Sequence, residues 1–120
     1  MEPEPLQPIT TAEQLEEAIN DRGTVFLFKH STSCTISLDA KEQMETFTLK
    51  HEEKKEYHYY LIDVIENRDI SNKIGNTFKI VHESPQLIVL RDNKLLFHMS
   101  HDAININDIE EKLGWKEIFL

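Results

Sequence analysis

The residue best suited to chemistry in this 120-residue sequence is its one cysteine, Cys34. Its neighbours are polar or cationic: Lys29, His30, Thr32, Ser33, Thr35 and Ser37. An apolar run ends just before this segment, and a helical pattern begins with Ile36, so we expect Cys34 at the start of a helix. Unpaired N–H groups and the positive end of the helix dipole favour a thiolate there. We therefore predict a nucleophilic thiol that attacks mixed disulfides.

A single cysteine limits the chemistry that this chain can perform alone. It excludes an intramolecular disulfide, a CxxC redox pair and a cysteine-rich zinc site, so a resolving thiol must come from another molecule. A cysteine hydrolase pairing Cys34 with His30 or His101 would also need an orienting residue and an oxyanion hole, for which the sequence has no signature. The six histidines form no HxxxH or HxH pair, and no metal site is predicted.

Ser37 and Pro85 are two further positions of interest for the predicted thiol chemistry. Ser37 lies three residues after Cys34, where one helical turn brings it back beside the thiol. Pro85, preceded by Ser84, stands immediately before a predicted strand and far from Cys34 in sequence. It is either a trans proline that starts the strand or a cis proline in a deliberate turn, and the sequence leaves both open.

The spacing of apolar residues predicts one α/β domain at residues 10–120, after an extended, proline-containing arm at residues 1–9. A capping box of Thr10 and Glu13 begins the first helix. Strands are predicted at residues 24–29 and 59–64, and helices from residue 36 and near residues 67–79. Residues 86–91 and 94–99 form a hairpin with a turn at Asp92-Asn93. A last helix is capped by Asn105 or Asn107 and ends at Gly114. This order predicts a four-stranded mixed sheet with helices on both faces.

Charge and hydropathy exclude several classes of partner. The net charge of −9 disfavours nucleic acid and anionic membrane surfaces, because both bind clustered Lys and Arg. No apolar stretch approaches the roughly 20 residues of a membrane span. The acidic start lacks the basic and apolar regions of a signal peptide, so we expect a cytoplasmic protein.

The segment Phe28-Lys29-His30-Ser31-Thr32-Ser33-Cys34-Thr35-Ile36-Ser37 resembles the monothiol bacilliredoxins of the bacillithiol system. Glu83-Ser84-Pro85-Gln86 and Ser100-His101 extend the likeness, which runs from about Thr10 to Leu113. The resemblance implies a thioredoxin-like fold and removal of bacillithiol, a cysteinyl-glucosamine malate thiol, from modified protein cysteines. The family usually has proline directly after the cysteine, whereas this chain has Thr35.

The resemblance also implies a role for each residue of the site. Cys34 is the nucleophile, Ser37 stands where dithiol relatives keep a resolving cysteine, and Pro85 is a cis proline whose preceding backbone pairs with an extended substrate. Residues expected to bind substrate are Lys29, His30, Thr32, Ser33, Thr35, Ser84, Pro85 and His101. Bacillithiol is the co-substrate, bacillithiolated proteins are the clients, and no bound cofactor is expected. The alternative is a redox-inactive thioredoxin-like interaction module in which Cys34 is incidental.

Overall fold

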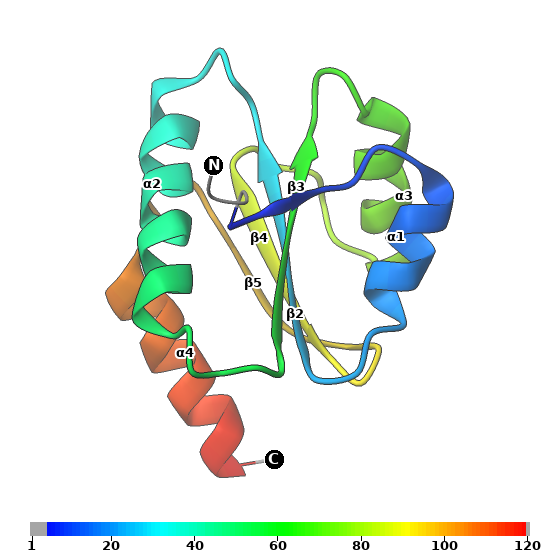
Figure 1. Ribbon diagram of the computed structural model, residues 1–120. Coiled ribbons are helices and arrows are strands. Elements are labelled where there is room, and N and C mark those ends of the chain that lie inside the picture. The colour runs from blue at the N-terminus through cyan, green and yellow to red at the C-terminus, as the bar shows by residue number, and fades with distance from the viewer. Residues whose placement is uncertain (1–4, 120) are drawn as a thin grey trace.

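A mixed sheet forms the centre of the computed structural model, which describes residues 5–119 and, for side chains, residues 5–114. Within these residues the sheet has five strands in the order β1-β3-β2-β4-β5 (Figure 1). The strands are β1 (Gln7–Pro8), β2 (Thr24–His30), β3 (Tyr57–Asp63), β4 (Gln86–Arg91) and β5 (Lys94–Ser100). The first three in spatial order are parallel, and β4 and β5 are antiparallel to their neighbours.

The prediction of four strands lacks one strand of the sheet, because Gln7 and Pro8 form β1 and pair with β3. The Ile9 amide continues this pairing by donating to the Leu61 carbonyl at 2.9 Å. Leu6 and Ile9 are buried on either side of it. A proline has no N–H to donate, but an edge strand of two residues tolerates one. Tertiary contact therefore orders a segment whose prolines argue against regular structure.

Helices cover both faces of the sheet, as predicted (Figure 1). The helices are α1 (Ala12–Ile19), α2 (Thr35–Lys50), α3 (Arg68–Phe78), a short 3-10 helix η1 (His101–Ala103) and α4 (Ile106–Phe119). Buried residues of α2 and α4 share one hydrophobic cluster, and those of α1 and α3 share another. The two clusters lie on opposite faces, which is the layering that an alternating strand and helix order produces.

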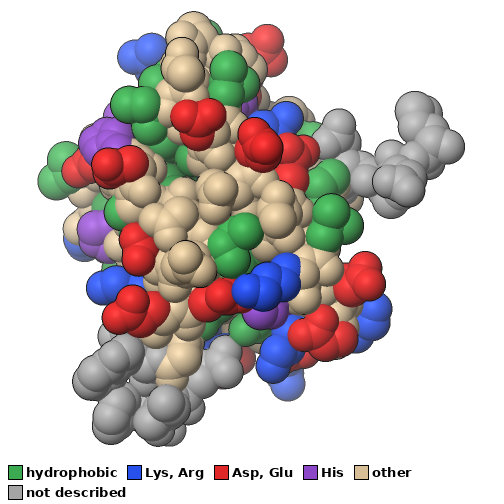
Figure 2. Space-filling model, turned by 90° about the vertical axis from the view of Figure 1, so that its left-hand side faces the viewer, with side chains coloured by type: hydrophobic (Ala, Val, Ile, Leu, Met, Phe, Trp, Pro, Cys, Tyr) green, Lys and Arg blue, Asp and Glu red, His purple; other side chains and the backbone are tan. Residues whose placement is uncertain are grey.

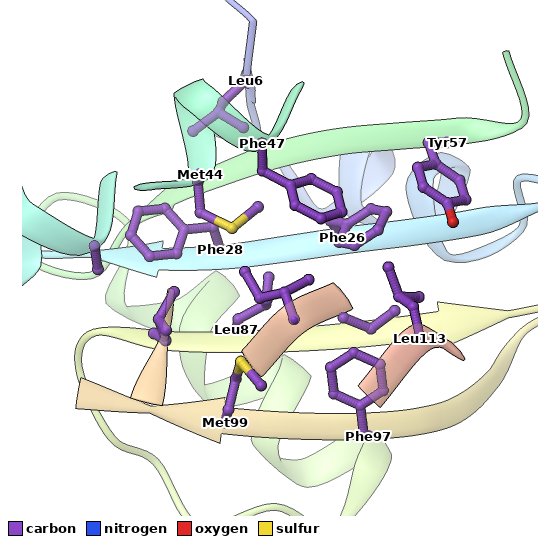
Figure 3. Packing of buried hydrophobic residues seen from close by; sticks show 14 residues of the cluster. Leu6, Phe26, Phe28, Met44, Phe47, Tyr57, Leu87, Phe97, Met99 and Leu113 are labelled. Carbon is purple, nitrogen blue, oxygen red and sulfur yellow. The ribbon is translucent and has the colours of Figure 1, made fainter. Parts of the chain in front are cut away.

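Strand β2 separates these two clusters and is buried along its whole length, as its continuous apolar run predicts. Phe26 and Phe28 belong to the α2 and α4 cluster, whereas Val25 and Leu27 belong to the other. Figure 3 shows Phe26, Phe28 and Phe47 packed together between the sheet and α2. The rings of Phe26 and Phe47 have centroids 5.5 Å apart, so aromatic packing anchors α2 to the strand that leads into it.

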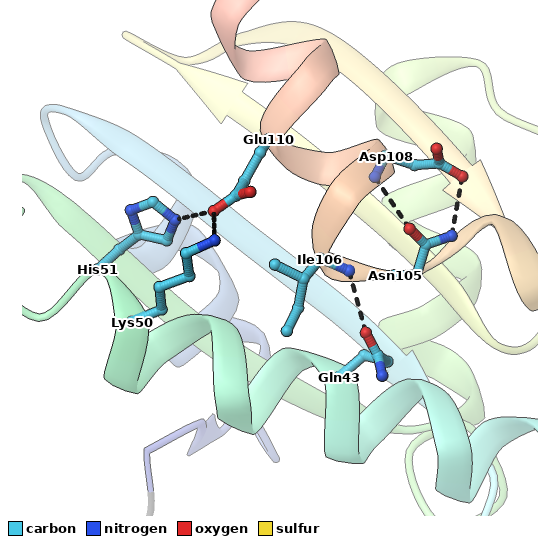
Figure 4. A network of polar contacts seen from close by, with 7 residues as sticks. All are labelled: Gln43, Lys50, His51, Asn105, Ile106, Asp108 and Glu110. Atoms are coloured by element: carbon cyan, nitrogen blue, oxygen red, sulfur yellow. Dashed lines mark hydrogen bonds and ion pairs between the residues drawn. The ribbon is translucent and has the colours of Figure 1, made fainter.

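Polar contacts hold α4 against α2 (Figure 4). One carboxylate oxygen of Glu110 lies 2.7 Å from both Lys50 Nζ and His51 Nε2, at the end of α2. The Ile106 amide, at the start of α4, donates to Gln43 Oε1 at 3.0 Å. Lys50 and His51 lower the pKa of the Glu110 carboxyl. These contacts fix the position of α2, and with it the loop that begins the helix.

Local details of the helix ends differ in part from the predictions. The cap of α1 is Thr11 with Gln14, one residue later than predicted. Asn105 does cap α4, since its Oδ1 accepts from the Asp108 amide at 2.9 Å. The predicted stop at Gly114 is wrong, because α4 continues to Phe119. Asp92 and Asn93 have φ values of 51° and 69°, which confirms the predicted hairpin turn.

Acidic and basic side chains alternate with exposed hydrophobic ones over the face that carries α2 (Figure 2). Among the described residues, no helix combines the length and apolarity that crossing a membrane needs.

Candidate active site

Cys34 is the residue that precedes the first turn of α2, as the sequence predicts. Its backbone is extended, with φ −115° and ψ 124°, and its carbonyl accepts from the Leu38 amide at 3.1 Å. The residue is partly exposed, and its side chain makes no capping hydrogen bond. The partly exposed cysteine thus stands at the N-terminus of a helix of 16 residues.

Ser37 and His30 form a buried hydrogen-bond network directly behind the cysteine loop. The Ser37 hydroxyl lies 2.8 Å from His30 Nδ1 and accepts from the Ser31 amide at 2.9 Å. Ser37 and His30 are 0% and 3% exposed. The described contacts of Ser37 Oγ do not include the Cys34 sulfur. The Ser37 hydroxyl ties the start of the loop to the first turn of α2.

His30 is held neutral near pH 7 by its surroundings. Burial lowers its pKa most, and Lys41 lowers it further, whereas Asp63, the hydrogen bond at Ser37 and Glu45 oppose the shift. Its ring stacks on Phe28 with centroids 5.8 Å apart. His30 is therefore a neutral partner of Ser37 within the fold.

Lys29 points to the opposite face of β2 from His30, because successive side chains of a strand alternate. It is 0% exposed, and its Nζ lies 3.3 Å from His82 Nδ1. Burial lowers the pKa of Lys29 to about 8. The ammonium predicted to bind substrate is enclosed by the α3 side of the protein, where it contacts protein groups.

Pro85 lies next to the end of β2, which brings it to the sheet edge where the cysteine loop starts. Lys29 pairs with Gln86 in the β2 and β4 register, so Pro85 stands beside His30. The Ser84-Pro85 peptide bond is cis. The Ser84 hydroxyl is buried and has no hydrogen-bond partner among the described residues. Sequence positions 34 and 85 are thus brought to one edge by strand pairing alone.

His101 completes this edge from the end of β5. Its amide donates to the Pro85 carbonyl at 3.0 Å, and its Nδ1 lies 3.5 Å from Glu83 Oε2. The backbone of His101 has a φ of 58°, where β5 turns into η1. The side chains of His101 and Glu83 are 52% and 43% exposed, so both are available to a substrate.

The remaining predicted substrate-binding residues, Thr32, Ser33 and Thr35, are exposed around Cys34. The structure thus places three exposed hydroxyls beside Cys34 in the loop, and Pro85 and His101 together at the end of the strand that leads into that loop. Sequence reasoning missed Ser31, His82 and Glu83 as contributors, although Ser31 and Glu83 lie within the segments that carry the family resemblance. Within the part of the chain that the structure describes, no cluster of three or more histidine, cysteine or acidic residues suits a metal ion.

Solved structures share this fold over most of the chain. A structure assigned as an oxidoreductase with a thioredoxin fold has a TM-score of 0.83 and 26% identity, covering 90% of this chain and 93% of that one. Thioredoxin from Fasciola hepatica has a TM-score of 0.74 and 18% identity over 92% of this chain and 99% of that one. Malassezia sympodialis thioredoxin has a TM-score of 0.74 and 13% identity over 92% and 90%. The last two show the fold alone.

The family model described as monothiol bacilliredoxin BrxC matches residues 7–109. This range contains every residue of the sheet edge described above, from the buried Lys29 to His101. It also begins at Gln7, the first residue of β1, which the resemblance from Thr10 onward did not include. A match over most of the sequence, together with a thioredoxin-like sheet and one accessible cysteine before α2, shows that the chain belongs to the monothiol bacilliredoxin family.

Proposed function

We propose that this chain is a thiol-disulfide oxidoreductase that removes bacillithiol from protein mixed disulfides through Cys34, in the cytoplasm. The observation that carries the proposal is the partly exposed thiol of Cys34 at the N-terminus of α2, in a chain of this family. Bacillithiol is its co-substrate and bacillithiolated proteins are its clients. No resident cofactor is needed, because the exchange uses sulfur atoms only.

The proposed exchange has two balanced steps. The Cys34 thiolate attacks the bacillithiol sulfur of the client's mixed disulfide, the bond between bacillithiol and the client breaks, and the client leaves as a thiolate. A new disulfide then joins Cys34 to bacillithiol. An external thiolate attacks the bacillithiol sulfur of this disulfide, a new disulfide joins that thiol to bacillithiol, and Cys34 leaves as a reduced thiolate. The chain has one cysteine, so an internal disulfide cannot replace the second step.

The residues around Cys34 suit the polar groups of bacillithiol. The hydroxyls of Thr32, Ser33 and Thr35 are exposed beside the thiol and can hydrogen-bond a sugar or a carboxylate. His101 lies across the edge, next to the Pro85 segment. We assign substrate contacts to these groups. His30 supports the loop from behind through Ser37.

The direct test is to incubate the reduced protein with bacillithiol disulfide and to weigh the intact product. We expect a mass gain of one bacillithiol per chain, localised to Cys34 by peptide mapping and removed by added thiol. Cys34→Ala is the control that should gain nothing. Glutathione disulfide, tested in parallel, reports whether another small thiol is the better co-substrate. A native chain that never acquires bacillithiol contradicts the proposal and favours the redox-inactive interaction module.

Ser37→Ala should slow transfer without abolishing it, and it should destabilise the fold. The change leaves the partly buried Ser31 amide and the buried His30 Nδ1 without their partner, which costs about 1–3 kcal/mol of unfolding free energy. Urea unfolding measures the stability, and release of client thiol measures the rate. Ser33→Ala, an exposed hydroxyl of the same loop, is the matched control and should leave stability unchanged. Complete loss of transfer in a folded Ser37→Ala protein would mean that the hydroxyl acts in the chemistry itself.

A further inference from the structure

A buried lysine lies beneath the segment that leads to Pro85. Lys29 is fully enclosed on the face of the sheet that α3 covers. Its ammonium forms no ion pair with a carboxylate among the described residues. An enclosed charge without a counter-ion destabilises a fold, and apolar residues often replace such groups with a gain in stability. The contacts of Lys29 therefore need to be considered to explain the presence of this charge.

The partner of Lys29 is His82, which lies on the surface with one ring nitrogen turned inward. His82 Nδ1 is 3.3 Å from Lys29 Nζ and 3.3 Å from the hydroxyl of Ser71, which is buried on α3. Burial, Lys29 and Arg68 lower the pKa of His82, and Glu83 opposes them. The imidazole is therefore neutral near pH 7, and the lone pair of Nδ1 accepts from the ammonium of Lys29, with the Ser71 hydroxyl in contact with the same nitrogen.

A second contact fixes the start of the same segment. The buried side chain of Gln86 donates from Nε2 to the Val81 carbonyl at 3.0 Å. Residues 81–85 are thus held at His82 by β2 and α3, and at Val81 by the first residue of β4. Between His82 and Gln86 lie Glu83, Ser84 and Pro85, the part of the segment that reaches the edge beside the cysteine loop.

We propose that Lys29 is a positioning residue, which by donating to His82 holds residues 81–85 where the client segment docks beside Cys34. The inference rests on the proposed function, since it assigns the docking of the client in that reaction. Lys29 acts from inside the fold through His82 and does not contact substrate. Lys29 and His30 are consecutive residues of β2 whose side chains lie on opposite faces of the sheet. Lys29 supports residues 81–85, and His30 supports the cysteine loop through Ser37.

The test uses Lys29→Met, His82→Phe and the double variant, each assayed for release of thiol from a bacillithiolated client. We expect KM for the client to rise about tenfold in each single variant, with kcat within about twofold, because a hydrogen bond to a charged group is lost. The double variant should be no worse than either single one, since both remove the same contact. Lys73→Met removes an exposed lysine of α3 and is the matched control.

Amide hydrogen exchange at residues 81–84 tests the positioning independently of the reaction. We expect faster exchange in Lys29→Met than in the native chain or in Lys73→Met. An unchanged KM in Lys29→Met, or effects of the two single variants that multiply in the double, overturns the proposal. If the native chain transfers no bacillithiol, the proposed function fails. Amide hydrogen exchange still decides whether Lys29 holds residues 81–85, because an unchanged rate in Lys29→Met overturns the positioning role.

Discussion

Cys34→Ser will abolish release of client thiol from a bacillithiolated protein while the fold remains intact. A serine hydroxyl is far less acidic and less nucleophilic than a thiol, so it does not attack a disulfide sulfur at neutral pH. Serine is also among the residues preferred before the first turn of a helix. Because the Cys34 side chain makes no capping hydrogen bond, the substitution should preserve or slightly raise the stability of α2.

The assay measures client thiol and follows both proteins by intact mass. Lys73→Met, which alters an exposed residue of α3 outside the site, should retain transfer. A Cys34→Ser protein that still releases the client would remove the redox assignment altogether. The fold would then serve as an interaction module, and binding of the client without a covalent adduct would be the observation to pursue.

Lys29→Met will stabilise the protein most at neutral pH, and the gain will disappear in alkaline solution. Burial lowers the pKa of Lys29 from 10.5 to about 8. Below pH 8 the folded and unfolded chains both carry the charge, so the fold bears the full penalty of enclosing it. Between pH 8 and 10.5 the unfolded chain binds more protons, so the unfolding free energy of the native chain rises with pH. The shift corresponds to roughly 3 kcal/mol.

Urea unfolding of the native chain and of Lys29→Met, measured at pH 7 and at pH 10, checks this prediction. We expect Lys29→Met to be about 2–3 kcal/mol more stable at pH 7, with a smaller difference at pH 10. Lys73→Met should change stability little at either pH, because its side chain is exposed. A Lys29→Met protein that is less stable than the native chain at pH 7 would show that the hydrogen bond to His82 outweighs the enclosed charge.

The two expected effects of Lys29→Met have opposite signs, and this separates function from structure. A residue that merely supports the fold loses stability and activity together when it is replaced. Lys29→Met should gain stability and lose affinity for the client. A charge that lowers the stability of the fold is then explained by its role in positioning residues 81–85, because activity can require a residue that destabilises the protein.

Local patterns in the sequence were sufficient for much of the framework. The apolar run before Cys34 and the helical spacing after it place the thiol at a strand-to-helix junction, because both patterns depend on neighbours within a few residues. Asp92-Asn93 specifies its hairpin turn through its tolerance of positive φ. The residues around Cys34 also indicate the family that the match over residues 7–109 shows. Each of these features is encoded within a short stretch of chain.

Tertiary structure alone decided the features that depend on residues far apart or on competition between neighbours. Strand β1 exists because β3 supplies partners to Gln7 and Ile9 across more than 50 residues, which outweighs the local effect of the prolines. Gly114 does not end α4, since a glycine stops a helix only where the backbone turns left-handed. Lys29 and His82 meet because β2, α3 and the segment before β4 pack together. Nothing in the sequence near either residue encodes that contact, because it is created by packing.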